Sequence, residues 1–243
     1  MSSLGALQAE YKENTQTMVT TGLIGIGCIA FGLVMLYYFW FGMTRESWFN
    51  QILFVIGGLC ALVGGISCVI TYFQNRGGRV AIHENGVLIE RKGKTLAATW
   101  DEIASVTESV EKMHMNGQYV YDRYLYTIEK TNGETMAVNN LVSDVKRFGE
   151  TVKRNTFARL YPQAVAKLDA GGNVSFGPLN LSADGLEAPG AKFTWSELSA
   201  VEIEGGQIEV KDRDGRSAFR GNWAATPNAH LFVGLVQNYL PVQ

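Results

Sequence analysis

The chain has few of the residues that build catalytic centres, disulfide frameworks or metal sites. Its 243 residues include three cysteines, three histidines and five prolines. All three cysteines lie inside long apolar runs, at Cys28, Cys60 and Cys68. The rest of the chain therefore has no thiol for a disulfide framework, which is consistent with a reducing compartment. The histidines are scattered and have neither zinc-site spacing nor a nucleophile–base motif around them, at His83, His114 and His230. We expect no metal ion, no cofactor and no enzymatic activity.

An excess of charge of either sign is also absent. Lysine and arginine number 21 against 23 aspartates and glutamates, which gives a formal net charge of −2 and an isoelectric point near 6.0. Nucleic-acid-binding domains usually carry a basic patch or stripe, so we expect no nucleic-acid partner.

Charged residues are missing altogether from two long stretches, Met18–Phe41 and Gln51–Phe73. As helices, these stretches rise roughly 34–36 Å, enough to cross a hydrocarbon core about 30 Å thick. The first is too long for the apolar part of a signal peptide, and aromatic residues occupy the place of a cleavage site, at Tyr37, Tyr38 and Trp40. The sequence predicts two retained membrane spans.

The orientation of these spans follows from the basic residues beside them. The connection 42–50 is short enough only for a tight helical hairpin, so both termini lie on the same side of the membrane. This connection contains one base, Arg45, whereas the other side has six, at Lys12, Arg76, Arg79, Arg91, Lys92 and Lys94. The positive-inside rule then predicts that both termini are cytoplasmic.

Small residues form two parallel rows on the second span. One row is Gly57, Ala61 and Gly65, and the other is Cys60, Gly64 and Cys68. Small residues at this spacing allow helices to approach closely in lipid, so we expect a helix-packing interface at Gly57, Ala61, Gly64, Gly65 and Cys68. Its partner is either the first span or a second protein. Neither span contains an ionisable residue, which argues against a transporter or channel built from this pair alone.

After residue 74 the pattern changes to short alternating runs separated by turns, which is typical of antiparallel sheet. The turns are marked by Asn85-Gly86, Asn132-Gly133 and Asp214-Gly215. The pattern also repeats, because Thr99–Val106 parallels Thr194–Val201. We expect Trp100 and Trp195 to be core residues, each followed by an acidic residue that accepts backbone hydrogen bonds.

Each copy of the repeat ends in an apolar helical pattern. In the first, Ser143 and Asp144 can cap a helix that carries Val145, Phe148 and Val152. In the second, Pro227 and Asn228 precede a similar apolar run. The connection 160–173 between the copies is open to interpretation as a helix, a linker or both.

This order of strands and helix resembles the pleckstrin-homology-like (PH-like) fold, and the whole chain is similar to a bacterial membrane-protein family of unknown function with a two-helix anchor and PH-like cytoplasmic modules. The residues that carry the resemblance are Gly86-Val87-Leu88, Thr99–Ile103, Val174–Pro178, Thr194–Leu198 and Pro227-Asn228. It implies an α+β fold, in which a transmembrane helical hairpin is followed by two tandem PH-like antiparallel β domains, each closed by a C-terminal helix. The expected ranges are a cytoplasmic segment 1–17, a hairpin 18–73 and PH-like domains 78–160 and 161–243, in the bacterial inner membrane.

Two functions are consistent with this architecture. The first is a non-enzymatic interaction or scaffold protein, an accessory subunit of a larger inner-membrane assembly, with a membrane-protein partner or a second copy of itself. The second is a peripheral sensor of anionic lipid headgroups. The resemblance implies that a basic loop between the first strands would make that contact, with Arg91, Lys92 and Lys94. The interpretation that this loop is only a solvated hairpin tip also stays open.

Overall fold

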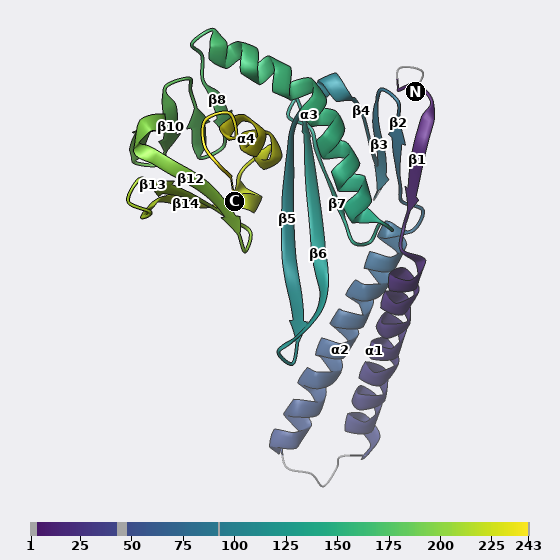
Figure 1. The fold of residues 1–243 in the computed structure, drawn as a ribbon. Helices are drawn as coiled ribbons and strands as arrows, with labels where there is room; N and C mark the ends of the chain where they lie inside the picture. The colour runs from purple at the N-terminus through teal and green to yellow at the C-terminus, as the bar shows by residue number, and fades with distance from the viewer. Residues whose placement is uncertain (1–3, 43–47, 92, 243) are drawn as a thin grey trace.

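A computed structural model describes residues 4–42, 48–91 and 93–242, which form an antiparallel helical hairpin beneath two β-rich units (Figure 1). Helices α1 (Thr15–Gly42) and α2 (Trp48–Asn75) confirm the two predicted apolar helices. Both are long and apolar enough to cross a membrane, and only 11% of the most apolar window of each is buried. Their apolar side chains therefore face outward rather than into a protein core. The predicted outer base, Arg45, lies outside the described residues.

The segment before α1 is part of the sheet that follows α2. Strand β1 (Leu7–Lys12) pairs antiparallel with β2 (Arg79–His83), and the sheet continues through β3 (Gly86–Arg91) and β4 (Lys94–Thr99) in the order β1-β2-β3-β4. The helical hairpin is thus inserted between the first two strands of one unit. The predicted ranges 1–17 and 78–160 divide this unit, because they leave its first strand outside it.

Residues before α1 also contribute to the core. Tyr11 is 6% exposed and packs edge-on against Phe148, with ring centroids 5.7 Å apart. Leu4 is buried against Ala81 and Leu88. Burial of these apolar side chains stabilises the attachment of β1, in addition to its ladder of backbone hydrogen bonds.

The first unit is completed by a second sheet and a helix. Strands β5 (Ile103–Met115), β6 (Gln118–Lys130) and β7 (Thr135–Asn139) form a sheet in the order β5-β6-β7, followed by α3 (Val145–Asp169). Both sheets and the start of α3 surround one core. The helix contributes its predicted apolar residues Val145, Phe148 and Val152, all of which are buried.

The second unit has the same order of elements. Its first sheet contains β8 (Val174–Phe176), β9 (Leu179–Leu181), β10 (Gly185–Ala188) and β11 (Ala191–Thr194). Its second sheet contains β12 (Leu198–Glu204), β13 (Gln207–Asp212) and β14 (Ser217–Asn222), and α4 (Ala229–Val236) follows. Where the first unit holds the helical hairpin between β1 and β2, the second has only Gly177-Pro178 between β8 and β9.

The repeated tryptophan motif forms the same turn in both units. Short 3₁₀ helices η1 (Trp100–Glu102) and η2 (Trp195–Glu197) each begin with a capping box. In η1, Glu102 accepts the backbone N–H of Thr99 at 2.9 Å, and this bond lowers the pKa of Glu102. In η2, Glu197 accepts the N–H of Thr194 at 2.8 Å with the same effect on its pKa. The predicted acceptor role of the acidic residue is confirmed.

The two tryptophans differ in burial. Trp100 is buried and donates its indole N–H to the carbonyl of Glu84 at 3.0 Å. Trp195 makes the equivalent bond to Ala183 at 2.9 Å, but it is only partly buried and stacks on Tyr239 with ring centroids 4.3 Å apart. The prediction of a core tryptophan therefore holds fully for the first unit and partly for the second.

Helix α3 connects the two units without a flexible linker. Its first half packs in the core of the first unit, and Ala164 and Leu168 near its end are buried in the core of the second. The helix continues through Pro162 to Asp169, so most of the connection 160–173 is helical. The predicted boundary at residue 160 falls inside this helix.

Asn228 joins the units through hydrogen bonds with the backbone of β5. Its side-chain oxygen accepts the N–H of Val106 at 2.8 Å, its amide donates to the carbonyl of Ala104 at 2.9 Å, and its own N–H donates to the carbonyl of Val106 at 3.0 Å. Asn228 has φ +53°, in the left-handed region, and so does Asp144 at the start of α3 with φ +50°. Neither side chain forms a helix-cap hydrogen bond within the described residues.

We expect Asn228→Ala to lower the free energy of unfolding by about 2–3 kcal/mol, because it removes two side-chain hydrogen bonds and places alanine in a left-handed conformation. Asn228→Gly should cost less, since glycine tolerates this conformation. Asp144→Gly is the matched control, because Asp144 has the same backbone geometry without a bond to the other unit. Thermal unfolding of the full-length chain in detergent measures all three. An Asn228→Ala variant as stable as the parent would contradict this role.

A second contact between the units contains a half-buried histidine. His230 of α4 lies near Phe157 of α3, with ring centroids 6.4 Å apart, and its Nε2 has no hydrogen-bond partner among the described residues. Burial and, to a smaller extent, the charge of Lys153 lower the pKa of His230 to about 4, and Glu108 opposes the shift. Lys153 donates to Glu108 at 2.7 Å, and Tyr126 donates to the same carboxylate at 2.8 Å.

This histidine makes the stability of the chain depend on pH. Between pH 6.5 and about 4 the unfolded chain protonates His230 while the folded chain keeps it neutral, so stability is lost as the pH falls through this window. We expect His230→Gln to reduce the loss between pH 7 and 5, by no more than about 2 kcal/mol. His114→Gln, at an exposed position, is the control. Equal pH dependence of His230→Gln and the parent, measured by unfolding, would exclude this effect.

Candidate functional site: a juxtamembrane groove

The entry to α1 is fixed to the turn that precedes α3. Glu13 forms an isolated antiparallel bridge with Val142, and the N–H of Asn14 donates to the carbonyl of Leu141 at 2.7 Å. The side chain of Asn14 then accepts the N–H of Thr17 at 3.2 Å, as an N-cap does. The first helix therefore leaves the sheet in a fixed direction.

The exit from α2 is tied to the same place. Gly77 has φ +81°, a conformation that favours glycine, and its N–H donates to Oε1 of Glu13 at 2.7 Å. The other carboxylate oxygen of Glu13 is buried and has no hydrogen-bond partner among the described residues. This contact closes the insertion, because it joins the residue before α1 to the residues after α2.

Arg91, one of the predicted lipid contacts, belongs to this junction. It donates to the side-chain oxygen of Asn139 at 2.9 Å and to the carbonyl of Ala137 at 3.3 Å. Burial lowers the pKa of Arg91, and the negative charge of Glu13 partly offsets that effect. A half-buried arginine engaged with β7 is poorly placed to bind a headgroup.

The other two predicted lipid contacts have different positions. Lys94 is exposed, and Lys92 lies outside the described residues. The register places the turn between β3 and β4 at the end of the sheet nearest α1 and α2, because Glu90 pairs with Arg79, four residues after the end of α2. Lys94 pairs with Arg91 one step nearer this end. The location of the turn suits a lipid contact, although only Lys94 is shown to be free of the sheet's interior.

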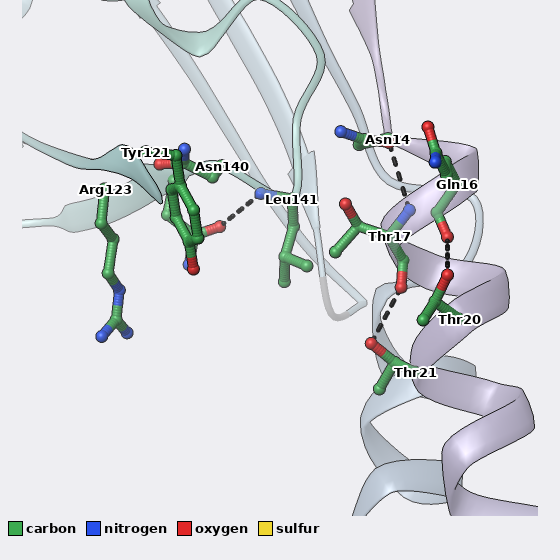
Figure 2. Close-up of a pocket in the computed structure, with 10 residues that line it drawn as sticks. Asn14, Gln16, Thr17, Thr20, Thr21, Tyr121, Arg123, Asn140 and Leu141 are labelled. Carbon is green, nitrogen blue, oxygen red and sulfur yellow. Dashed lines mark hydrogen bonds between the residues drawn. The ribbon is translucent and has the colours of Figure 1, made fainter. Parts of the chain in front are cut away.

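A groove of about 720 Å³ lies beside this junction, between the first turns of α1 and the ends of β6 and β7 (Figure 2). Its lining is mostly amide and hydroxyl side chains, namely Asn14, Gln16, Thr17, Thr20, Thr21, Tyr121, Arg123, Asn139, Asn140 and Leu141. Because its helical wall is the start of the apolar run of α1, the groove lies at the level where a bilayer surface would begin.

Much of the groove's polar lining is occupied by the fold itself. Thr20 and Thr21 donate their hydroxyls to backbone carbonyls one turn earlier, at 2.8 and 2.9 Å (Figure 2). Asn140 accepts the N–H of Tyr124 at 2.6 Å and donates to the carbonyl of Asp122 at 3.0 Å. These hydrogen bonds fix the shape of the groove.

Arg123 is the cation of this groove. Its Nη1 lies 3.7 Å from Oε2 of Glu111, and both side chains are more than half exposed, at 58% for Arg123 and 62% for Glu111. Exposed pairs of this kind contribute at most about 1 kcal/mol, so Arg123 can exchange this partner for a phosphate or carboxylate. Sequence reasoning did not select Arg123, because its position beside α1 depends on the length and direction of β6.

The helical hairpin is held together by glycine contacts. Gly65 and Gly25 approach so closely that a Cβ on Gly65 would lie 2.7 Å from the Gly25 carbonyl oxygen, and a Cβ on Gly32 would lie 2.8 Å from that of Gly58. In lipid, such close approach maximises packing between helices. The first span is thus a partner of the small residues in the second.

The predicted interface residues divide between this contact and the outward surface. Gly65 is buried in it, Ala61 is half-buried, and Cys68 is half-buried beside Gly25. A Cβ on Gly57 would make only an ordinary contact with Met35, and one on Gly64 would have no described atom within 4 Å. The seven-residue spacing of Gly58 and Gly65, and of Gly25 and Gly32, is the signal that identifies the contacting pairs.

No candidate metal-binding cluster forms within the described ranges. They contain no group of three or more histidine, cysteine, aspartate or glutamate side chains that could hold a metal ion. His83 lies near the carbonyl of Gly5 at 3.2 Å, His114 is on the tip of the β5–β6 hairpin, and His230 is between the units. The three histidines therefore lie in three different parts of the fold.

A known protein family matches almost the whole chain. The family described as "Family of unknown function (DUF6585)" matches residues 1–240, a range that covers β1, the helical hairpin and both units. No curated protein matches the chain. The description of the family assigns no activity.

The glycine contacts predict that substitution by leucine lowers stability at one of two neighbouring positions and leaves it unchanged at the other. Gly65→Leu should lower the free energy of unfolding of the detergent-solubilised chain by about 1–3 kcal/mol, because the leucine side chain would overlap the backbone of α1. Gly64→Leu should leave stability unchanged, since that position faces outward. Equal behaviour of the two variants in thermal unfolding would show that α1 and α2 do not pack in this way.

Proposed function

We propose that this chain, which belongs to the DUF6585 family, is a membrane-anchored interaction protein that holds two PH-like units in a fixed orientation against the membrane surface. The observation that carries the proposal is the insertion of the helical hairpin between β1 and β2. Both ends of an inserted anchor are attached to the sheet, so the first unit has no single flexible tether. A surface held this way meets a membrane partner in one orientation.

The assignment of the units as PH-like is supported by their order of elements. Each has a four-stranded sheet, a three-stranded sheet and a C-terminal helix, and each has the Thr-Trp turn between its sheets. A PH-like fold has this arrangement of a bent antiparallel sheet closed by a helix. On this assignment, the anchor replaces the first interstrand loop of the first unit.

The proposed location is the bacterial inner membrane, with both units in the cytoplasm. The structure places the segment before α1 and the units after α2 at one end of the hairpin (Figure 1). This end carries the basic residues Lys12, Arg76, Arg79 and Lys94, and the positive-inside rule assigns such an end to the cytoplasm.

The partner we propose is another membrane protein, for which this chain is an accessory subunit. The outward surface of the hairpin keeps glycines at positions where the contact between α1 and α2 does not need them. A Cβ on Gly27 or Gly64 would meet no described atom within 4 Å. Small residues on a lipid-facing surface permit a further helix to approach closely. A non-enzymatic role of this kind remains a prediction.

The second candidate, a sensor of anionic headgroups, is favoured by one observation. The β3–β4 turn lies at the membrane-facing end of the sheet and carries the exposed Lys94. Engagement of Arg91 with β7 reduces the charge available there. One lysine near an anionic surface contributes about 1 kcal/mol, so this turn alone is a weak sensor.

Extraction in mild detergent followed by native mass spectrometry tests both candidates. We expect the full chain to carry a stoichiometric protein companion or a second copy of itself, and Gly64→Leu to lose it while the β units stay folded. Val63→Leu is the matched control, because Val63 is outward-facing and already large. An isolated chain, or a companion retained by Gly64→Leu, would reject the accessory-subunit proposal.

The same spectra report bound lipid. For a headgroup sensor, Lys94→Glu should reduce the anionic phospholipid retained, whereas Lys192→Glu, at the corresponding turn of the second unit, should not. Lipid retention unaffected by Lys94→Glu would exclude the sensor and leave the protein-partner proposal in place.

A further inference from the structure

The β5–β6 hairpin extends far beyond the core that it helps to form. Its strands have 13 residues each, whereas the corresponding strands of the second unit, β12 and β13, have 7 and 6. Ile103, Val106, Tyr126 and Ile128 are buried near its base. Most of the residues beyond them are exposed, so the outer half of the hairpin is not needed to complete the first unit.

The tip of this hairpin is uncharged and exposes several large apolar side chains. Between Lys112 and Asp122 there is no aspartate, glutamate, lysine or arginine. The largest exposed side chains are Met115 at 67%, Tyr119 at 56%, Val120 at 49% and Tyr121 at 48%. The corresponding turn of the second unit is Gly205-Gly206, flanked by Glu204 and Gln207. An uncharged tip with exposed apolar side chains is therefore a specific property of the first unit.

The hairpin points along the helical hairpin rather than away from it. Tyr121 and Arg123 line the juxtamembrane groove opposite Thr17, Thr20 and Thr21, the first turns of α1. Figure 1 shows β5 and β6 running from the core in the direction of α1 and α2. From Tyr121 the hairpin continues to the turn at Asn116-Gly117, on the side away from the core of the first unit. The tip consequently reaches past the level at which the apolar part of α1 begins.

We infer that this tip, residues 113–121, enters the interfacial layer of the same bilayer that α1 and α2 cross, as a third membrane contact of the chain. The inference rests on the proposed membrane anchoring. Phospholipid is the occupant that the side chains fit, because tyrosine prefers the headgroup level and Met115 and Val120 suit the upper acyl chains. The Glu111–Arg123 pair lies two residue pairs closer to the core than Met113 and Tyr121, on the aqueous side.

The backbone of the hairpin limits how deeply it can enter. The ladder satisfies only the groups that β5 and β6 turn toward each other, for example at Met113 and Tyr121. Outward-facing N–H and C=O groups need water or headgroup partners, which the hydrocarbon core lacks. The tip therefore stays in the interface, where it fixes the rotation of the first unit about the axis of the helical hairpin.

Photocrosslinking from lipid tests this contact on the unmodified chain. The protein is reconstituted in phosphatidylcholine vesicles that contain an analogue with a diazirine near the top of an acyl chain, and crosslinked residues are mapped by mass spectrometry. Crosslinks in 113–121 as well as in α1 and α2 support the inference. Crosslinks confined to α1 and α2 overturn it and leave the anchoring intact, whereas crosslinks absent from α1 and α2 refute the anchoring itself.

A fluorescent probe gives a second measurement at single residues. In a chain whose Cys28, Cys60 and Cys68 are alanine, Val120→Cys and Asp214→Cys are each labelled with an environment-sensitive dye. Lipids that carry a doxyl quencher near the headgroup should remove most of the emission at position 120 and none at position 214, on the exposed β13–β14 turn. An equal loss of emission at the two positions would overturn the inference, because the tip would then face water or protein.

Discussion

The pairing of β1 with β2 is the constraint on which the rest of the structure depends. It brings Leu7–Lys12 and Arg79–His83 into one sheet across the whole helical hairpin, and it allows Tyr11 to complete the core with Phe148. The bond from Gly77 to Glu13 and the bridge between Glu13 and Val142 close the same junction from the other side. Because both helices leave from one fixed point, the direction of the anchor is determined by the sheet.

The two units show how one sequence pattern supports different surroundings. The capping box and the tryptophan indole bond are the same in η1 and η2, and a side chain on Gly86 or Gly185 would overlap the neighbouring strand's backbone in both units. The units differ where each one contacts the helical hairpin or the other unit. The first holds the anchor and the long β5–β6 hairpin, and the second uses Asn228 to bind the free edge of β5.

The sequence predicts those features that depend on local pattern. Uncharged runs identified α1 and α2, and asparagine–glycine turns and the repeated Thr-Trp motif identified the β units. Strand β1 could not be found in this way, because it is short and its partner lies more than 60 residues away. The extent of α3 was also hidden, since Pro162 is usually a sign that a helix ends. For the site, four-residue spacing selected Gly65, which lies against α1, but not Gly58, whose contact depends on the rotation of α2 against α1.

The inserted position of the anchor sets an order for biosynthesis. Lys12 leaves the ribosome long before Arg79, its partner in the sheet, and both helices are made in between. The first unit therefore cannot close while its early part is being translated, and β1 must wait in an unpaired state until α1 and α2 have been made and β2 has emerged. With the two helices crossing a membrane, as we propose, any delay in their insertion also delays folding of the first unit.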